Sequence, residues 1–307
     1  MRYVDVKNDV AFRKIFGNEK KKIILISFLN AVLGLEGTDR IRKVTLLNPY
    51  QFPRIVNEKA SIIDVKAIDG KGATFIVEMQ VAEVDGFQKR VLYYQCKDYA
   101  SQILVGDEYP KLRPVYFIGI LDFNYFSGKN YLSKHLIVDG ETGECVFKDM
   151  QFRFIELGKF KKDIGELENV IDQWTYFIKN ALKIESVPAD VVDEGLKEAY
   201  GEAERFRWTK NQYDAYIKAG IARQDRIGEI TFAEKKGRKL AEAEKDKVIE
   251  EKDNEIAAKN NEIAVKDNEI VAKDNELKEA IKNAKLDKQK NEDLARQLAE
   301  LQKQIKG

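Results

Sequence analysis

The sequence has few of the side chains that build the common zinc and thiol sites. Its 307 residues include two cysteines, Cys96 and Cys145, and one histidine, His135. These are too few for a zinc-finger ligand set or a disulfide framework, and they leave cysteine–histidine catalysis without support. Two buried thiols and an ordinary histidine are the simpler interpretation. Any metal chemistry must therefore depend on carboxylates.

Long apolar runs, signature loops and net charge are also missing. The longest apolar runs, such as residues 23–29, are far shorter than a membrane span, and the charged first residues do not resemble a signal peptide. There is no glycine-rich phosphate loop, Walker lysine or G-x-S-x-G elbow. The chain has 53 lysines and arginines against 52 acidic residues, so any basic groove must be local. We expect a soluble cytoplasmic protein without membrane association.

The periodicity of apolar residues predicts an α+β domain with helices packed on a central mixed β-sheet. One or two further strands are expected between residues 145 and 157, and residues 164–182 and 188–238 have helical patterns. The expected elements of the first domain are helices at residues 7–16, 19–33 and 85–105 and strands at residues 42–47, 61–69, 73–81 and 114–123.

The C-terminal segment has an internal repeat of seven residues. The blocks KDNEIAA, KNNEIAV, KDNEIVA and KDNELKE place Ile256, Ile263, Ile270 and Leu277 on one helical stripe. The second core position of each heptad is polar, so the segment is interpreted as a weak coiled coil that makes homo-oligomers, with a single solvated helix as the alternative. The expected domains are residues 1–160, a helical region at 161–244 and the coiled coil at 245–307.

A predicted β-hairpin carries the candidate chemistry. If Gly70, Lys71 and Gly72 form a three-residue loop, the register places Asp64 directly opposite Glu78. Their flanking residues are apolar, and two adjacent buried carboxylates are costly unless a cation or a proton neutralises them.

The hairpin therefore predicts a site for Mg²⁺ or Mn²⁺, with Asp64, Glu78 and the backbone carbonyl of Met79 as ligands. Gln80 lies on the same face as Glu78, where its amide would orient the attacking water. The alternative is that this face is open to solvent and that these are ordinary surface residues.

Three ordered segments resemble one family. The stretch SIIDVKAIDGKGATFIVEMQ resembles the acidic core of the PD-(D/E)XK nuclease family transposases, which are similar to the recombination-promoting nucleases of bacteria. The segment NDVAFRKIFG resembles the opening motif of that family, with Arg13 in place of the usual lysine, and residues 87–123 resemble its arginine-tyrosine helix, turn and following strand. The resemblance covers about residues 4–126.

The resemblance implies a restriction-endonuclease-like core and a magnesium-dependent endonuclease, a hydrolase of DNA phosphodiester bonds in recombination or mobile-element processes. It makes Asp64 and Glu78 the metal ligands and places Gln80 where the wider superfamily has lysine. The alternative function is a catalytically inactive oligomeric module that binds nucleic acid or protein. Because loss of function tends to remove the acidic pair and both acids are present, the enzyme is the preferred hypothesis.

Two further groups of residues are candidates. Asp9 would add a carboxylate to the metal or its water, or would only complement the dipole at a helix N-terminus. Arg90 is expected to hold a phosphate, with Tyr93 and Lys89 contacting the nucleic-acid backbone from the same helix. For Tyr94 we prefer a packing role.

Overall fold

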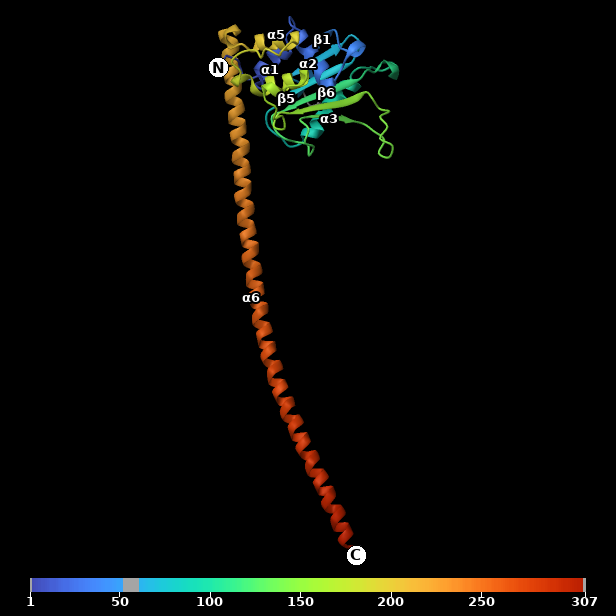
Figure 1. Cartoon of the computed structure of the whole chain (residues 1–307), viewed down its shortest axis with the longest axis vertical. Coiled ribbons are helices and arrows are strands. Elements are labelled where there is room, and N and C mark those ends of the chain that lie inside the picture. The colour runs from blue at the N-terminus through green and yellow to red at the C-terminus, as the bar shows by residue number, and fades with distance from the viewer. Residues whose placement is uncertain (1, 52–60, 306–307) are drawn as a thin grey trace. The chain divides into compact units, whose positions relative to one another are not determined.

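A mixed six-stranded β-sheet forms the centre of the N-terminal part of the chain (Figure 1). The computed structural model describes residues 2–51 and 61–305. In spatial order the strands are β1 (Val44–Leu47), β4 (Val65–Asp69), β5 (Thr74–Gln80), β6 (Val115–Leu121), β8 (Met150–Glu156) and β7 (Leu132–Leu136). The neighbours β5, β6 and β8 are parallel and the other pairs are antiparallel. The predicted α+β class with a central mixed sheet is confirmed.

Helices cover both faces of this sheet. On one face they are α1 (Asp9–Phe16), α2 (Ile23–Leu33), α4 (Val170–Asn180) and α5 (Glu194–Ala203), and on the other face α3 (Phe87–Ala100). The larger core lies under the first group and contains Trp174 and Phe28, while the smaller core joins Phe87 to Phe117 and Phe154. Short 3₁₀ turns are η1 (Gly37–Asp39), η2 (Tyr109–Lys111), η3 (Ile164–Glu166), η4 (Ala181–Lys183) and η5 (Arg205–Arg207).

Local signals explain where two of the helices begin or end. The Asn8 side chain accepts hydrogen bonds from the N–H groups of Val10 and Ala11 at the start of α1. Gly34 ends α2 with a φ of 67°, a left-handed conformation that glycine adopts without a steric penalty. The helix expected at residues 85–105 is shorter than predicted, because α3 stops at Ala100 and the residues up to Gly106 lie in the following loop.

The β4–β5 hairpin has the predicted register. Val65 pairs with Val77 and Ile68 with Thr74, and the Asp69 N–H donates to the Ala73 carbonyl at 3.0 Å across the three-residue loop. Gly72 has a φ of 88° in that loop, which explains the need for glycine. The expected single strand over residues 61–69 is divided, however, into β4 and β3 (Ser61–Ile62), which pairs with β2 (Tyr50–Gln51). Asp64 therefore lies at the bend before β4.

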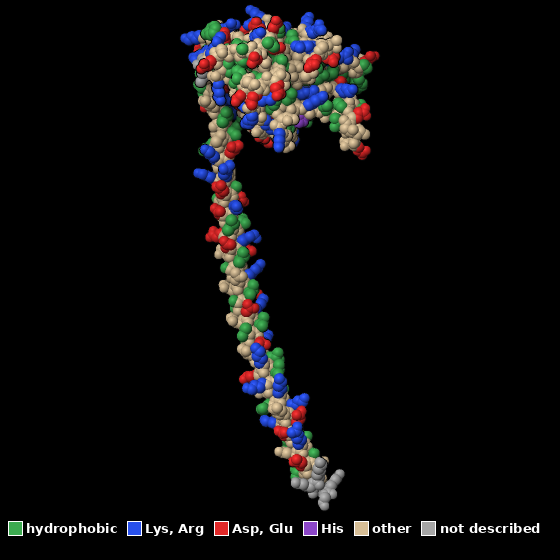
Figure 2. All heavy atoms as spheres, viewed as in Figure 1, with side chains coloured by type: hydrophobic (Ala, Val, Ile, Leu, Met, Phe, Trp, Pro, Cys, Tyr) green, Lys and Arg blue, Asp and Glu red, His purple; other side chains and the backbone are tan. Residues whose placement is uncertain are grey.

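The chain continues in one long helix, α6 (Lys210–Ile305). The chain as a whole divides into two units, Met1–Gly228 and Glu229–Gly307. The first turns of α6 therefore belong to the N-terminal unit. Apolar and oppositely charged side chains are interspersed along the helix surface (Figure 2). None of the described helices is long and apolar enough to cross a membrane. The divisions near residues 160 and 244 stay predictions.

Candidate active site

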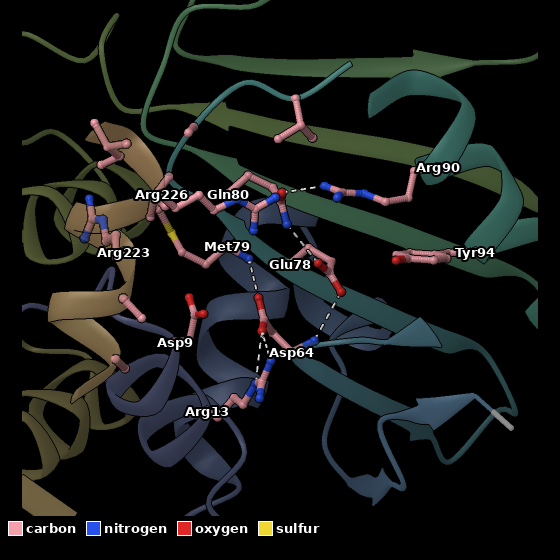
Figure 3. A pocket seen from close by; sticks show the side chains of 16 residues that line it. Asp9, Arg13, Asp64, Glu78, Met79, Gln80, Arg90, Tyr94, Arg223 and Arg226 are labelled. Atoms are coloured by element: carbon pink, nitrogen blue, oxygen red, sulfur yellow. Dashed lines mark hydrogen bonds and ion pairs between the residues drawn. The ribbon is translucent and has the colours of Figure 1, made fainter. Parts of the chain in front are cut away.

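The predicted metal ligands line a pocket of about 380 Å³ in the N-terminal unit (Figure 3). The C-terminal end of β5 forms its floor, with α1, α3 and the first turns of α6 around it. It is lined by Asp9, Arg13, Asp64, Glu78, Met79, Gln80, Val81, Ala82, Val84, Arg90, Tyr94, Ala219, Ala222, Arg223, Arg226 and Ile227.

Asp64 and Glu78 are buried and linked through the backbone of each other's strand. The Asp64 N–H donates to Glu78 Oε1 at 3.1 Å, and the Met79 N–H donates to Asp64 Oδ2 at 2.9 Å. Their exposed fractions are 9% and 6%. Because the chain bends at Asp64, side-chain oxygens take the place of the carbonyl partners that a regular strand would supply. The bend thus holds both carboxylates side by side.

Arg13 joins helix α1 to this pair. Its Nε and Nη2 atoms donate to Asp64 Oδ1 at 3.0 and 2.9 Å. Two donors on one oxygen make a charge-assisted contact that fixes the Asp64 carboxylate. In the sequence, Arg13 was only a departure from the lysine of the family motif; in the structure it is the cationic partner of Asp64.

Gln80 connects Glu78 to helix α3. Its Nε2 atom donates to Glu78 Oε2 at 3.0 Å, and Arg90 Nη2 donates to Gln80 Oε1 at 2.5 Å. Arg90 also lies over the Phe87 ring, 5.9 Å from the ring centroid. The amide of Gln80 is therefore oriented on both sides, and one of its two N–H donors has no acceptor among the described residues.

The charge of Glu78 is poorly compensated. Burial, followed by the nearby Asp64 carboxylate, raises the pKa of Glu78 to about 8. Burial also raises the pKa of Asp64, against the opposing effects of the Met79 N–H and Arg13. Among the described residues, no lysine or arginine lies within ion-pair distance of Glu78. A cation in the pocket would favour the ionised form of both groups.

The other predicted residues divide into two groups. Asp9 lines the pocket, and its negative charge contributes to the raised pKa of Asp64. Lys89 and Tyr93 lie on α3 outside the pocket, whereas Tyr94, for which packing was preferred, lines it. The roles of all these residues in catalysis or binding stay predictions.

Sequence reasoning missed the wall that α6 contributes. Arg223 forms ion pairs with Asp5 Oδ2 and Asp122 Oδ2, each at 3.1 Å, which hold this part of α6 against the N-terminal segment. Arg226 lines the pocket and forms no ion pair with a described residue. The spacing of Ala219, Ala222, Arg223 and Arg226 puts them on one helical face, a signal that the sequence did contain.

The donor set of the pocket fits a hard cation. Among the described residues, no group of three or more histidine, cysteine or acidic side chains could hold a metal ion. A metal here would therefore use two carboxylates with backbone or water oxygens, which is the ligand chemistry of Mg²⁺. The Met79 N–H faces Asp64, and the carbonyl of the same residue in an extended strand points the same way.

Comparison with known proteins identifies the family. The family described as PD-(D/E)XK nuclease family transposase matches residues 6–233. Neither the curated proteins nor the solved structures include a match to this chain. The family match extends beyond the resemblance seen in the sequence and includes the first turns of α6 that line the pocket. The chain therefore belongs to the PD-(D/E)XK nuclease family transposases.

Proposed function

We propose that the protein is a divalent-metal-dependent DNA endonuclease that hydrolyses phosphodiester bonds in the pocket of Asp64 and Glu78. One observation carries the proposal: Glu78 is buried beside a second carboxylate without a cationic partner among the described residues. Membership in a family of nucleases supports the same reaction. The transposase description of the family supports a proposed role in recombination or mobile-element processes.

The proposed metal ligands are the Asp64 and Glu78 carboxylates and the Met79 carbonyl, with Mg²⁺ or Mn²⁺ as the ion. When bound, such an ion lowers the pKa of a coordinated water and stabilises the negative charge that grows on the phosphate. All three ligands are oxygen atoms, as a hard cation prefers. Because both carboxylates have a raised pKa, a bound cation also relieves the cost of ionising them.

Gln80 and Asp9 act around this pair in the proposal. The second N–H of the Gln80 amide is directed by the bonds to Glu78 and Arg90, so it can donate to the attacking water or to a phosphate oxygen. Asp9 adds negative charge to the same pocket, where it accepts a hydrogen bond from that water.

Four arginines give the pocket a local excess of basic side chains, although the chain as a whole is nearly neutral. Arg13, Arg90, Arg223 and Arg226 all line the pocket, and the whole chain has a net charge of only +1. Arg13 and Arg223 are engaged by carboxylates. Arg90 and Arg226 are therefore the proposed phosphate contacts, because a guanidinium matches the geometry of phosphate oxygens. Lys89 and Tyr93, which lie outside the pocket, are the proposed contacts to the DNA backbone beyond it.

The tail is proposed to assemble copies of the chain. The stripe residues Ile256, Ile263, Ile270 and Leu277 are between 55% and 63% exposed on α6. A repeated apolar stripe on a long helix gains stability by packing on a second helix, whereas a solitary helix leaves it in water. A homo-oligomeric coiled coil is the arrangement that this repeat favours.

Plasmid cleavage tests the nuclease proposal. Supercoiled DNA is incubated with the full-length protein in a magnesium series and in EDTA, alongside Asp64→Asn, Glu78→Gln and the exposed control Glu108→Gln. We expect metal-dependent nicking by the wild type and the control, and none by folded Asp64→Asn or Glu78→Gln. Cleavage by a folded Asp64→Asn protein would place the chemistry elsewhere. Salt-dependent DNA binding without cleavage would favour the inactive binding module.

A further inference from the structure

The buried charges of the N-terminal unit are almost all paired. Outside the candidate active site, every carboxylate that is buried among the described residues forms an ion pair. These pairs are Asp98 with Lys66, Glu156 with Lys159, Asp172 with Lys162, and Glu204 with Arg2 and Arg207. Outside the candidate active site, Arg153 is the exception: it is only 7% exposed, and no carboxylate of the described residues lies within ion-pair distance of it.

The hydrogen-bond acceptors of Arg153 among the described residues are uncharged. Its Nη1 atom donates to the Phe152 carbonyl at 3.1 Å, and its Nη2 atom donates to Gln151 Oε1 at 3.3 Å. Burial lowers the pKa of the guanidinium. A buried cation without a counter-charge destabilises the fold relative to one that is paired with a carboxylate. The position of this cation therefore requires an explanation beyond packing.

The side chain of Arg153 lines a cavity of about 430 Å³. Ala73 and Pro114 lie on its wall just before β5 and β6 begin. The cavity is therefore at the N-terminal end of β5, whereas Glu78 is near the C-terminal end of the same strand. Phe75 and Tyr116 form a stacked pair on the wall, with ring centroids 5.3 Å apart and an interplanar angle of 14°. The cavity thus combines a flat aromatic surface with a buried cation.

Other charged residues line the cavity as well. Lys134 is exposed on β7 and pairs in register with Arg153 on β8, so both side chains are on the same face of the sheet. Asp69 accepts hydrogen bonds from the Lys71 and Ala73 N–H groups through Oδ1, which commits it to the hairpin turn. Asp39 lines the cavity without forming an ion pair to Arg153. Among the described residues, no carboxylate forms an ion pair with Arg153.

We propose that this cavity binds a small organic anion, with its carboxylate or phosphate on Arg153 and its apolar body against Phe75 and Tyr116. The planar guanidinium of arginine binds two oxygens of such groups at once. The cavity volume is within the range of small-molecule sites, about 300–1,000 Å³, and its mixture of apolar walls and a few polar or charged groups is typical of them. Lys134 adds a second cation at the rim.

This anion site is separate from the proposed nuclease pocket. Phe75 and Arg153 are on the sheet face that α2 covers, with Ile118 and Ile155. Side chains alternate between the two faces along β5, so Glu78 and Gln80 are on the opposite face, toward α3. The two sites can therefore be tested separately, and failure of one leaves the other unaffected.

The test uses sodium benzoate, adenosine 5′-monophosphate and inorganic phosphate on the full-length protein, with sodium chloride at matched ionic strength as the reference. Melting temperature and calorimetric titration are measured for the wild type, Arg153→Met and the exposed control Arg238→Met. We expect at least one organic anion to raise the melting temperature above the chloride reference in the wild type and control but not in Arg153→Met. Stabilisation by benzoate would identify the bound group as a carboxylate, and stabilisation by adenosine 5′-monophosphate would identify it as a phosphate.

The sign of the stability change separates a binding role from a structural one. Without added anion, Arg153→Met should melt at or above the wild-type temperature, because an unpaired buried charge is removed. If Arg153→Met does not fold, Lys134→Met at the exposed rim should weaken binding several-fold. The absence of any effect beyond chloride in the wild type would overturn the proposal. Equal binding of inorganic phosphate and the organic anions would overturn the part assigned to Phe75 and Tyr116.

Discussion

Replacement of Glu78 by glutamine should stabilise the metal-free protein at neutral pH, although it removes a proposed metal ligand. In the folded protein the pKa of Glu78 is about 8, against 4.5 for the ordinary group. Between these values the folded state retains a proton that the unfolded chain has lost. The free energy of unfolding must then fall as pH rises from 4.5 to about 8 and level off above that. Glutamine does not titrate, so the variant keeps the unfolding free energy that the wild type loses over this pH range.

The magnitude follows from the shift and from one hydrogen bond. One pKa unit corresponds to about 1.36 kcal/mol, so the penalty on the wild type reaches about 3 kcal/mol at pH 7. Glutamine can still accept from the Asp64 N–H, but its amide nitrogen would face the Gln80 nitrogen that now donates to Glu78. Loss of that hydrogen bond costs about 1 kcal/mol. The expected net gain for Glu78→Gln at pH 7 is therefore about 2 kcal/mol.

Urea denaturation in EDTA between pH 5 and pH 9 measures this effect, with Glu108→Gln as the exposed control. The difference between Glu78→Gln and wild type should be near zero at pH 5 and should grow through pH 8. Magnesium should then reverse the order, because ligand binding stabilises the folded wild type more than a variant that lacks a ligand. Parallel pH profiles in EDTA, or a variant less stable than wild type at pH 8, would refute the reasoning.

Three further predictions concern activity, binding and assembly. Gln80→Ala should reduce the rate of plasmid nicking by up to about tenfold while cleavage stays metal-dependent, because it removes one uncharged hydrogen-bond donor, worth about 1 kcal/mol; a rate equal to wild type would exclude Gln80 from the reaction. Arg226→Ala and Arg90→Ala should each weaken DNA binding and flatten its salt dependence by about one unit of slope, measured by fluorescence anisotropy, and an unchanged slope would remove that arginine from the interface. Truncation after Glu244 should reduce the mass by light scattering to a monomer, and a full-length monomer would contradict the coiled coil.

The hairpin could be predicted because its determinants are local. The loop from Gly70 to Gly72 fixes which residues pair, and the alternation of strands then puts Glu78 and Gln80 on one face. The bend at Asp64 could not be predicted in this way, because it depends on the separate pairing of β3 with β2. Because of that bend, Asp64 and Glu78 are not an ordinary cross-strand pair; each carboxylate accepts a hydrogen bond from a backbone N–H of the other segment.

Two features of the structure have weak sequence signals. Strand β7 has the sequence LSKHL, and its side chains are exposed or half-buried at the edge of the sheet, so its apolar alternation is faint. The contribution of α6 to the pocket depends on ion pairs between Arg223 and residues more than a hundred positions earlier in the chain. Periodicity along one helix does not identify a partner at such a distance.

Helix α6 contains a spacer that neither the pocket nor the repeat uses. Ile227 is the last residue of the helix that lines the pocket, and the first of the four repeated blocks begins at Lys252. The intervening turns can therefore change in length while the pocket-lining residues and the repeat keep their sequences. Gain or loss of seven residues would nearly preserve the helical face on which the stripe continues, because seven residues are close to two turns. We expect related chains to differ in this spacer by whole heptads more often than by other lengths.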